Sequence, residues 1–217
     1  MNSELNPLQP QPRRAGWYKR LFAYMMAQES AEYDDAVAGR KQALLGNLHG
    51  EVLEIGPGTG PNLSFYAPDV HWVGVEPNPA MWPYAQREAK QLGLNIELRD
   101  GTAEHLPAPD NSVDAVVGTL VLCSVRSQTE TLQEILRVLK PGGHYVFMEH
   151  VAAPRGTGTR RLQNIVQPLW GVFADGCHAN RETWAEIEQA GFSRVQLEHF
   201  RLDGPIAGPH IAGFAVK

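Results

Sequence analysis

The chain has 217 residues, a formal net charge of −5 and two cysteines. This length suits one domain with a full core, and 43% hydrophobic with 20% charged residues is ordinary for a soluble globular protein. The negative charge disfavours a nucleic-acid partner, which needs a clustered basic surface. Two cysteines are too few for a disulfide framework and indicate a reducing compartment, so we expect a cytoplasmic protein. The first residues lack the apolar core of a signal peptide, and the apolar run 21–27 is too short to span a bilayer.

The two ends of the N-terminal region differ in pattern. Residues 1–14 are rich in proline and poor in apolar side chains, which predicts a disordered tail, and residues 15–217 are predicted to form a single domain. From Trp17 onward apolar side chains recur at helical spacing, and a weaker helical pattern continues through residues 31–48. Two interpretations of residues 17–26 remain open: a helical cap over a ligand pocket, and an interfacial helix that contacts a membrane surface.

The most informative stretch spans residues 51–61. The apolar run Val52–Ile55 predicts a buried strand. Glycines follow it at alternate positions: Gly56, Gly58 and Gly60. Such glycines allow a tight turn and let a ligand lie against the backbone. A dinucleotide fingerprint needs a further glycine where Pro61 stands, and a phosphate-binding loop needs a lysine that is absent here. The acidic Glu54 would repel a pyrophosphate and suits a cationic ligand such as S-adenosylmethionine. A tight strand-to-helix turn without a ligand is the alternative.

A second acidic residue, Glu76, ends the next predicted strand, which spans residues 70–76. It lies about twenty residues beyond the glycine loop, a position from which a carboxylate accepts hydrogen bonds from a ribose diol. A helix is predicted to begin at Pro77 to Pro79 and to run to Gln91. An acid exposed to solvent at a strand end is the alternative interpretation.

The rest of the chain alternates strands and helices, which is typical of a doubly wound α/β fold. Further strands are predicted at residues 95–99, 113–122 and 145–151, and helices at residues 128–139, 160–173 and 181–190. Pro168 is expected to kink or end the second of these helices. A turn with a short helix is predicted at residues 100–107, a polar loop at 174–180, and two closing strands, antiparallel in direction, at 194–202 and 210–216.

Five motifs together resemble the class I S-adenosylmethionine-dependent methyltransferases. They are Glu54-Ile-Gly-Pro-Gly-Thr-Gly60, Glu76-Pro-Asn-Pro79, Gly101-Thr-Ala-Glu-His-Leu-Pro107, Ser112-Val-Asp-Ala-Val116 and Leu139-Lys-Pro-Gly-Gly143. The resemblance implies a Rossmann-like sheet of seven strands with the last strand antiparallel, an N-terminal helical cap, and S-adenosylmethionine as cofactor. The residues that it places on the cofactor are Glu54, Gly56, Gly58 and Gly60 along the methionine, Glu76 on the ribose, Pro77 and Asn78 beside the adenosine, Thr102 and Ala103 by the adenine, and Thr119 and Leu120 at the methionine. Thr102 is a departure, because many members carry an aspartate there.

A narrower resemblance covers nearly the whole chain from Glu54 onward. Its motifs are Gly58-Thr-Gly60 with Asn62, Thr119-Leu-Val-Leu-Cys-Ser-Val125, Glu149-His-Val151, Asp175-Gly-Cys177, Arg181-Glu-Thr-Trp184, Gly208-Pro-His-Ile211 and Ala215-Val-Lys217. They are similar to the alkyl thiol methyltransferases, the methyltransferase-like proteins seven A and seven B. Those proteins carry an N-terminal hydrophobic membrane segment. The sequence pattern here predicts no such segment, so we expect a soluble relative. It also implies methyl transfer to the sulfur of a small thiol or sulfide.

Methyl transfer from a sulfonium depends mainly on positioning and a dry pocket, and a thiol acceptor needs little more than a path to its thiolate. His150 is the best candidate base, because it follows the fifth predicted strand at the edge where ligands bind, although a histidine bonded to the backbone is equally consistent. The narrower resemblance places Asp175, Cys177 and His210 on the acceptor side, with Asp175 as a second catalytic candidate. Cys123 is interpreted as a buried structural thiol. The eight histidines show no metal-ligand spacing, so no metal is expected.

Three functions remain open. The first is a methyltransferase for a small-molecule thiol or sulfide. The second is a lipid or quinone methyltransferase of the phosphatidylethanolamine or menaquinone type, since those enzymes share much of the central motif set. The third is an interaction module that binds the cofactor without turnover, against which the intact glycine loop and Glu76 argue. The pattern leaves the acceptor and the oligomeric state undetermined.

Overall fold

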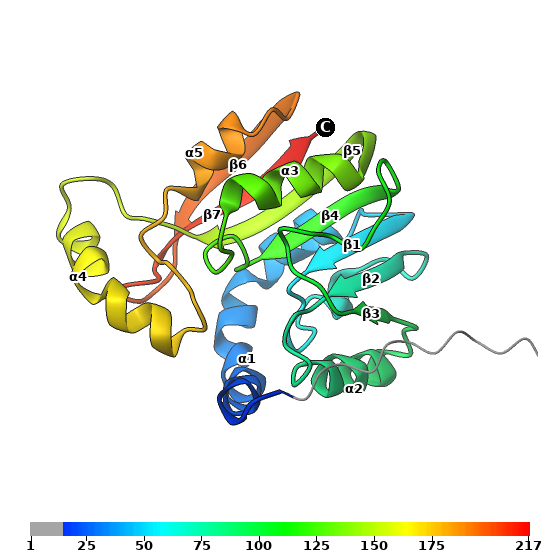
Figure 1. Ribbon diagram of the computed structural model, residues 1–217, viewed down its shortest axis with the longest axis horizontal. Coiled ribbons are helices and arrows are strands. Elements are labelled where there is room, and N and C mark those ends of the chain that lie inside the picture. The colour runs from blue at the N-terminus through cyan, green and yellow to red at the C-terminus, as the bar shows by residue number, and fades with distance from the viewer. Residues whose placement is uncertain (1–14) are drawn as a thin grey trace, which may run out of the picture.

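The computed structural model describes residues 15–217, and the predicted tail at residues 1–14 lies outside them. One seven-stranded sheet runs through the described residues, with helices on both faces (Figure 1). Its strands are β1 (Glu51–Ile55), β2 (His71–Val75), β3 (Glu97–Arg99), β4 (Val113–Thr119), β5 (Leu139–His150), β6 (Arg194–Arg201) and β7 (Pro209–Val216). In space the order is β3-β2-β1-β4-β5-β7-β6. The first five strands are parallel, and β7 is antiparallel to both of its neighbours. The predicted doubly wound sheet with an antiparallel last strand is confirmed.

The helices form a layer on each face of the sheet. They are α1 (Trp17–Leu45), α2 (Trp82–Leu92), α3 (Gln128–Val138), α4 (Gly158–Phe173) and α5 (Thr183–Gln189), and a 3-10 helix, η1 (Leu63–Phe65), follows the glycine loop. On one face Ile135 of α3 and Ile187 of α5 are fully buried against β4 and β5. On the other face the end of α1 and α2 bury Leu45 and Trp82. Because both faces are covered, residues 115–118 of the central strand β4 are buried in succession.

Helix α1 is the longest helix, with 29 residues. Its second half buries Val37 and Leu45, whereas Trp17 and Leu21 in its first turns are exposed. The first turns extend beyond the sheet and lie between α4 and α2 (Figure 1). The predicted N-terminal helix is therefore confirmed, and it continues without a break to Leu45. Within residues 15–217, no helix has both the length and the apolar character that crossing a bilayer requires.

The start of α2 differs from the prediction. The Asn78 side chain accepts a hydrogen bond from the Ala80 N–H at 3.1 Å, which closes a turn before the helix. Helix α2 then begins at Trp82, with Pro83 in its first turn. The predicted start near Pro79 was wrong, because asparagine side chains that bond to nearby backbone compete with helix formation.

Two further elements bear on the predictions, and the first of them differs. Residues 100–107 form turns in place of the expected short helix, with an isolated antiparallel bridge between Thr102 and His105. The Leu106 N–H there donates to the Glu134 carboxylate of α3 at 2.8 Å, so tertiary contact holds the segment in this form. Helix α4 reaches Phe173, as predicted, and Pro168 lies inside it, so only the alternative that Pro168 ends the helix was wrong.

Candidate active site

The three glycines after β1 have different tasks. Gly56, Gly58 and Gly60 have positive φ angles of 59°, 56° and 90°, which glycine adopts at no steric cost. A Cβ at Gly60 would lie 2.9 Å from Leu63 and 3.3 Å from the Ala85 Cα, so this glycine lets η1 and α2 pack closely. A Cβ at Gly58 would meet no atom within 4 Å. Gly58 therefore borders open space at the carboxyl end of β1, where a ligand can lie against the backbone.

Glu54 is fully buried below this loop and is held by three donors. Asn62 Nδ2, the Tyr66 hydroxyl and Trp72 Nε1 donate to its oxygens at 2.8, 2.7 and 2.9 Å. Burial raises the pKa of Glu54, and these hydrogen bonds oppose the rise. Asn62 also donates to Thr119 Oγ1 at 2.6 Å, which ties the loop to the end of β4. A carboxylate has about four acceptor positions, so one remains for the cofactor contact that the sequence predicts.

Glu76 lies just past the end of β2 and faces the same loop. Its two oxygens accept hydrogen bonds from the backbone N–H groups of Gly58, at 3.0 Å, and Asn78, at 2.7 Å. Burial raises the pKa of Glu76 to about 7, although both N–H groups favour the ionised form. The predicted ribose-binding carboxylate is thus buried, fixed in orientation and in contact with the glycine loop.

The end of β4 is strained at the position predicted to contact the methionine part of the cofactor. Leu120 has a φ angle of 58°, and its N–H donates to the Met148 carbonyl at 2.9 Å. Left-handed backbone at a bulky non-glycine residue is a marker of functional sites. This conformation also explains why β4 ends at Thr119 and not at residue 122 as predicted.

The remaining predicted cofactor residues lie at the ends of β2 and β3. Asn78 and Ala103 are buried, whereas Pro77 and Thr102 are exposed. The Asn78 side chain donates to the Lys19 carbonyl of α1 at 3.2 Å, so α1 lies against this end of the site. The residues present fit a cationic nucleoside ligand, because an open glycine backbone and two buried carboxylates face the same edge of the sheet.

The acceptor side contains a cluster that the linear sequence did not reveal. Cys123 follows β4, His150 ends β5, and Cys177 lies in the loop after α4. One side-chain N or S atom from each lies within 4.8 Å of the others, and His150 Nε2 is 3.1 Å from Cys177 Sγ. All three residues are buried. The expectation of no ligand spacing holds along the chain, but the fold brings these three residues together.

The protonation of this cluster is set by burial and by mutual contact. Burial alone would lower the pKa of His150, but its contact with Cys177 and the charge of Glu149 raise it above the usual value. Contact with Cys123 and burial raise the pKa of Cys177. In His150, the predicted base, Nε2 is in contact with the Cys177 thiol. The other ring nitrogen, Nδ1, has no hydrogen-bond partner among the described residues.

Two residues near His150 were missed by sequence reasoning. Glu149 is fully buried; its Oε1 accepts from the Val121 and Leu122 N–H groups at 2.9 Å, and its Oε2 has no partner in the described chain. Burial raises the pKa of Glu149 to about 7. The buried Tyr33 hydroxyl of α1 is likewise unpartnered among the described residues. The sequence could have pointed to Glu149, because it immediately precedes the candidate base His150. Nothing in the sequence pattern of α1 distinguishes Tyr33.

His210 and Asp175 also lie on this side but have other partners. The His210 ring is 5.8 Å from that of Tyr33 and 6.1 Å from that of His150, and burial lowers the pKa of His210 to about 4. Both Asp175 oxygens accept from Lys19 Nζ at 2.7 Å, which joins α1 to the loop after α4. The catalytic role of Asp175 stays a prediction, and its position is that of a residue holding α1.

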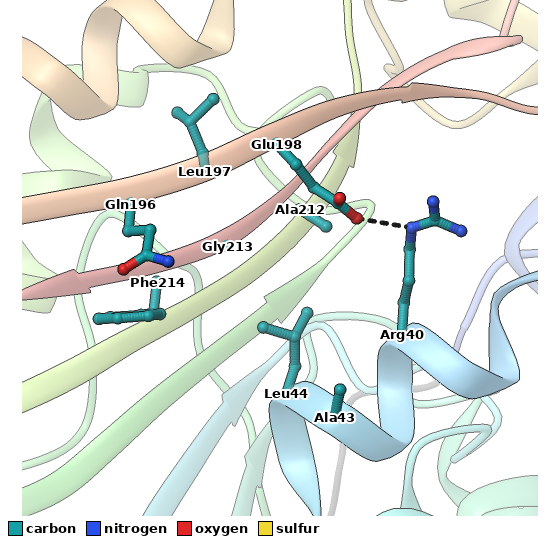
Figure 2. Close-up of a pocket in the computed structure, with 9 residues that line it drawn as sticks. All are labelled: Arg40, Ala43, Leu44, Gln196, Leu197, Glu198, Ala212, Gly213 and Phe214. Atoms are coloured by element: carbon teal, nitrogen blue, oxygen red, sulfur yellow. Dashed lines mark hydrogen bonds and ion pairs between the residues drawn. The ribbon is translucent and has the colours of Figure 1, made fainter.

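A groove between α1 and strands β6 and β7 lies apart from these residues (Figure 2). Arg40 and Glu198 form an ion pair of 2.8 Å across it. Leu44 and Phe214 also border it, and none of the residues that line it is a predicted cofactor or acceptor residue. The site is therefore assigned to the carboxyl edge of the sheet.

Comparison with known proteins is consistent with this geometry. Residues 53–147 match the family model described as "Methyltransferase domain". Human thiol S-methyltransferase TMT1A is 38% identical over 213 residues, covering 92% of this chain and 87% of that protein. Rat thiol S-methyltransferase TMT1B is 39% identical, with the same coverage of both chains. The chain belongs to this methyltransferase family. It is an enzyme that uses S-adenosylmethionine.

Two further similarities are either shorter or of lower identity. A phosphatidylethanolamine N-methyltransferase from Cereibacter sphaeroides is 33% identical over 49% of this chain and 54% of that protein. A solved methyltransferase structure from Aquifex aeolicus superimposes with a TM-score of 0.60 at 19% identity, over 91% of this chain and 97% of that one. At this level of identity the structural likeness supports the fold alone.

Proposed function

We propose that this protein transfers the methyl group of S-adenosylmethionine to the sulfur of a small-molecule thiol. The observation that supports this proposal is the share of the chain that is similar to thiol S-methyltransferases. The thiol S-methyltransferases match 92% of the chain, a stretch long enough to include the loop with Cys177 on the acceptor side. The phosphatidylethanolamine enzyme matches only about half of the chain.

The cofactor end of the site has the residues that this role needs. Bound S-adenosylmethionine supplies a methyl group on a positively charged sulfur. Glu76 would hold the ribose, and Gly58 would let the cofactor lie against the backbone. The buried charge of Glu54 suits the ammonium of the amino-acid tail, because a cation gains more from a carboxylate in a low-dielectric interior than in water. Leu120 and Thr119 would border the methionine part.

The acceptor end is largely excluded from solvent, which suits a thiol. A free thiol has a pKa of about 8.5, so a few per cent is already ionised near neutral pH. His150, Cys123 and Cys177 are nearly excluded from solvent, and burial of the nucleophile strengthens its attraction to a cationic methyl donor. The described chain therefore has to position the sulfur and keep water away from it, and His150 is a titratable side chain available at this end of the site.

A release assay for S-adenosylhomocysteine tests this proposal. The purified full chain is offered hydrogen sulfide, alkyl thiols, phenols, amines, a quinol and lipid vesicles. Turnover with sulfide or thiols, abolished in Glu76→Ala under subsaturating cofactor, supports the proposal. Calorimetry that shows cofactor binding with no release from any thiol would contradict it.

One observation favours a second candidate, a lipid or quinone methyltransferase. Large apolar side chains are exposed at the start of α1 and along α4, among them Trp17, Ile165 and Phe173, at 78%, 75% and 72% exposure. The two segments are joined by a hydrogen bond from the Tyr18 hydroxyl to the Val172 carbonyl at 2.6 Å. Exposed apolar residues on adjacent helices can contact a lipid surface. Turnover that requires lipid or quinol, and is lost in a Trp17→Ser, Phe173→Ser variant that still binds cofactor, would favour this candidate.

A further inference from the structure

The buried cluster of Cys123, His150 and Cys177 has the geometry of a metal site. Its three donor atoms lie within 4.8 Å of one another, although they come from β4, β5 and the loop after α4. The ligand atoms of one tetrahedral zinc ion are about 3.5–4 Å apart, given the usual zinc–sulfur and zinc–nitrogen bond lengths. Side-chain exposure is 1%, 8% and 5% in the same order, so solvent would not compete for the ligands.

The surrounding residues hold the two cysteines in place. Trp170 Nε1 donates to Cys177 Sγ at 3.2 Å, and Gln167 Nε2 donates to the Cys177 carbonyl at 2.9 Å. The His178 N–H donates to the Cys123 carbonyl at 2.8 Å, which joins the two cysteine-bearing loops directly. An N–H aimed at a sulfur is the outer contact that stabilises a metal-bound thiolate. The cluster is thus arranged in advance of any ligand.

Charge and chemistry favour zinc among the common ions. Two thiolates and a neutral imidazole around a doubly charged cation give a neutral group, which can be buried at little cost. Soft sulfur donors with an imidazole select zinc or copper(I) over magnesium or calcium. Two cysteines and one histidine are also a donor set found in catalytic zinc sites, which keep the fourth position free.

We propose that Cys123, His150 and Cys177 bind one zinc ion, and that its fourth coordination position takes the acceptor thiol. This deepens the proposed function and rests on it. The position fits, because Cys123 lies three residues beyond Leu120, whose carbonyl is 3.3 Å from Cys123 Sγ. The ion therefore lies next to the strand end predicted to contact the methionine part of the cofactor.

The reaction balances without a further reagent. The thiol loses its proton to solvent as its sulfur binds zinc. An electron pair of that sulfur then forms the new carbon–sulfur bond, while the bond from the methyl carbon to the sulfonium breaks and leaves its pair on the donor. A neutral thioether and S-adenosylhomocysteine are the products. A thioether binds zinc weakly because it carries no charge, which favours its release.

Metal content of the full chain is the first test. The protein is prepared without a polyhistidine tag, with both thiols reduced, then treated with chelator and reloaded with zinc alone. We expect one zinc per chain by mass spectrometry of the elements, and less than a tenth of that in Cys123→Ser and in Cys177→Ser. His71→Gln is the matched control, because this histidine is 78% exposed and lies at the start of β2. Affinity for S-adenosylhomocysteine confirms that each variant is folded.

Cobalt replacement of the ion tests the acceptor role without any variant. We expect a thiolate-to-cobalt charge-transfer band and the intense visible bands of a tetrahedral site, and a shift of the visible bands when a small thiol is added with S-adenosylhomocysteine present. No stoichiometric metal in the reduced wild-type chain, or a Cys123–Cys177 disulfide recovered in its place under anaerobic preparation, would overturn the site. Stoichiometric metal with thiol turnover but no thiol-induced shift would overturn the acceptor role. A bound ion with no thiol turnover would contradict the proposed function and leave the metal site standing.

Discussion

The cofactor half and the acceptor half of this site are built in different ways. The cofactor half uses the ends of consecutive strands, and its key contacts involve backbone, as when Gly58 and Asn78 donate N–H groups to Glu76. The acceptor half uses side chains from segments far apart in the sequence, such as Tyr33, Cys123 and Cys177. A local motif is therefore enough to define the first half, whereas the second exists only in the folded chain. Changes in the two halves should accordingly separate binding from turnover.

The largest expected effect is confined to the acceptor half. Replacing His150 by alanine should lower turnover by roughly 10²–10⁴-fold, the range for a group that handles a proton or activates a nucleophile. The affinity for S-adenosylhomocysteine, measured by calorimetry, should change less than threefold. A cooperative loss of folding in both His150→Ala and His150→Gln would instead assign this buried histidine a structural role.

The glycine loop allows the next comparison, within the cofactor half. Gly60→Ala should lower the free energy of unfolding by about 2–4 kcal/mol, because the new Cβ meets Leu63 and Ala85 at a backbone conformation that alanine avoids. Gly58→Ala is the matched variant, since it carries the backbone strain without the clash and should cost about 1–2 kcal/mol. Urea unfolding measures both. Equal destabilisation by the two substitutions would show that Gly60 is not required for packing.

Glu76→Ala should weaken cofactor binding by roughly 1.5–3 kcal/mol, the range for hydrogen bonds to a charged group. Two backbone N–H groups also lose their acceptor, so the loop should become less well ordered. Calorimetric titration with S-adenosylhomocysteine measures the effect. A folded variant with unchanged affinity would remove Glu76 from the ribose site.

The same carboxyl should make cofactor binding depend on pH. Burial raises the pKa of Glu76 to about 7, so the group gains a proton as the pH falls through 7 and then accepts fewer hydrogen bonds from a ribose. Affinity for S-adenosylhomocysteine should therefore rise by about tenfold between pH 6 and pH 8. Glu76→Gln should bind more weakly and show a flat profile. A wild-type profile that is also flat would mean that the carboxyl stays ionised over this range.

The fold and the cofactor half could be predicted because their signals are local. Alternating strands and helices, the glycine spacing and the acid at Glu76 each depend on residues close together in the sequence. Two predictions made from local signals were wrong. Helix α2 begins later than predicted because of the turn at Asn78, and the short helix expected within residues 100–107 is replaced by turns, where Leu106 contacts Glu134.

The acceptor half could be predicted only in part. His150 was placed on this side by its position at the end of a predicted strand, and Cys177 and His210 by resemblance, but their mutual contacts were not foreseen. Cys123 and Cys177 are separated in the chain by α3, β5 and α4. The distance between their side chains depends on the positive φ angles of Leu120 and Asp175 as well as on the sheet. The burial of Glu149 could not be predicted either, because it follows from having neighbouring strands on both sides of β5.

The smallest expected effect concerns the residue that joins the two halves. Lys19→Met removes the ion pair with Asp175, in which the two side chains are 42% and 24% exposed, so it should cost only about 0.2–1 kcal/mol of stability. The difference from the wild type should shrink at high salt. Thermal unfolding at two ionic strengths measures it. A larger loss that is independent of salt would mean that the lysine contributes through packing and not through charge.

Lys19 connects the two halves of the site, although its ion pair with Asp175 contributes little to stability. Its carbonyl accepts from Asn78 in the cofactor half, and its ammonium binds Asp175 in the acceptor half, while Trp17 two residues earlier is exposed. A single turn of α1 therefore contacts residues of both halves and reaches the outer surface. If a partner that bound the outer face displaced this turn and so weakened cofactor binding, thermodynamic reciprocity would require bound cofactor to weaken that partner by the same factor. In that case, whether the cofactor site is occupied would affect binding at the outer face of α1.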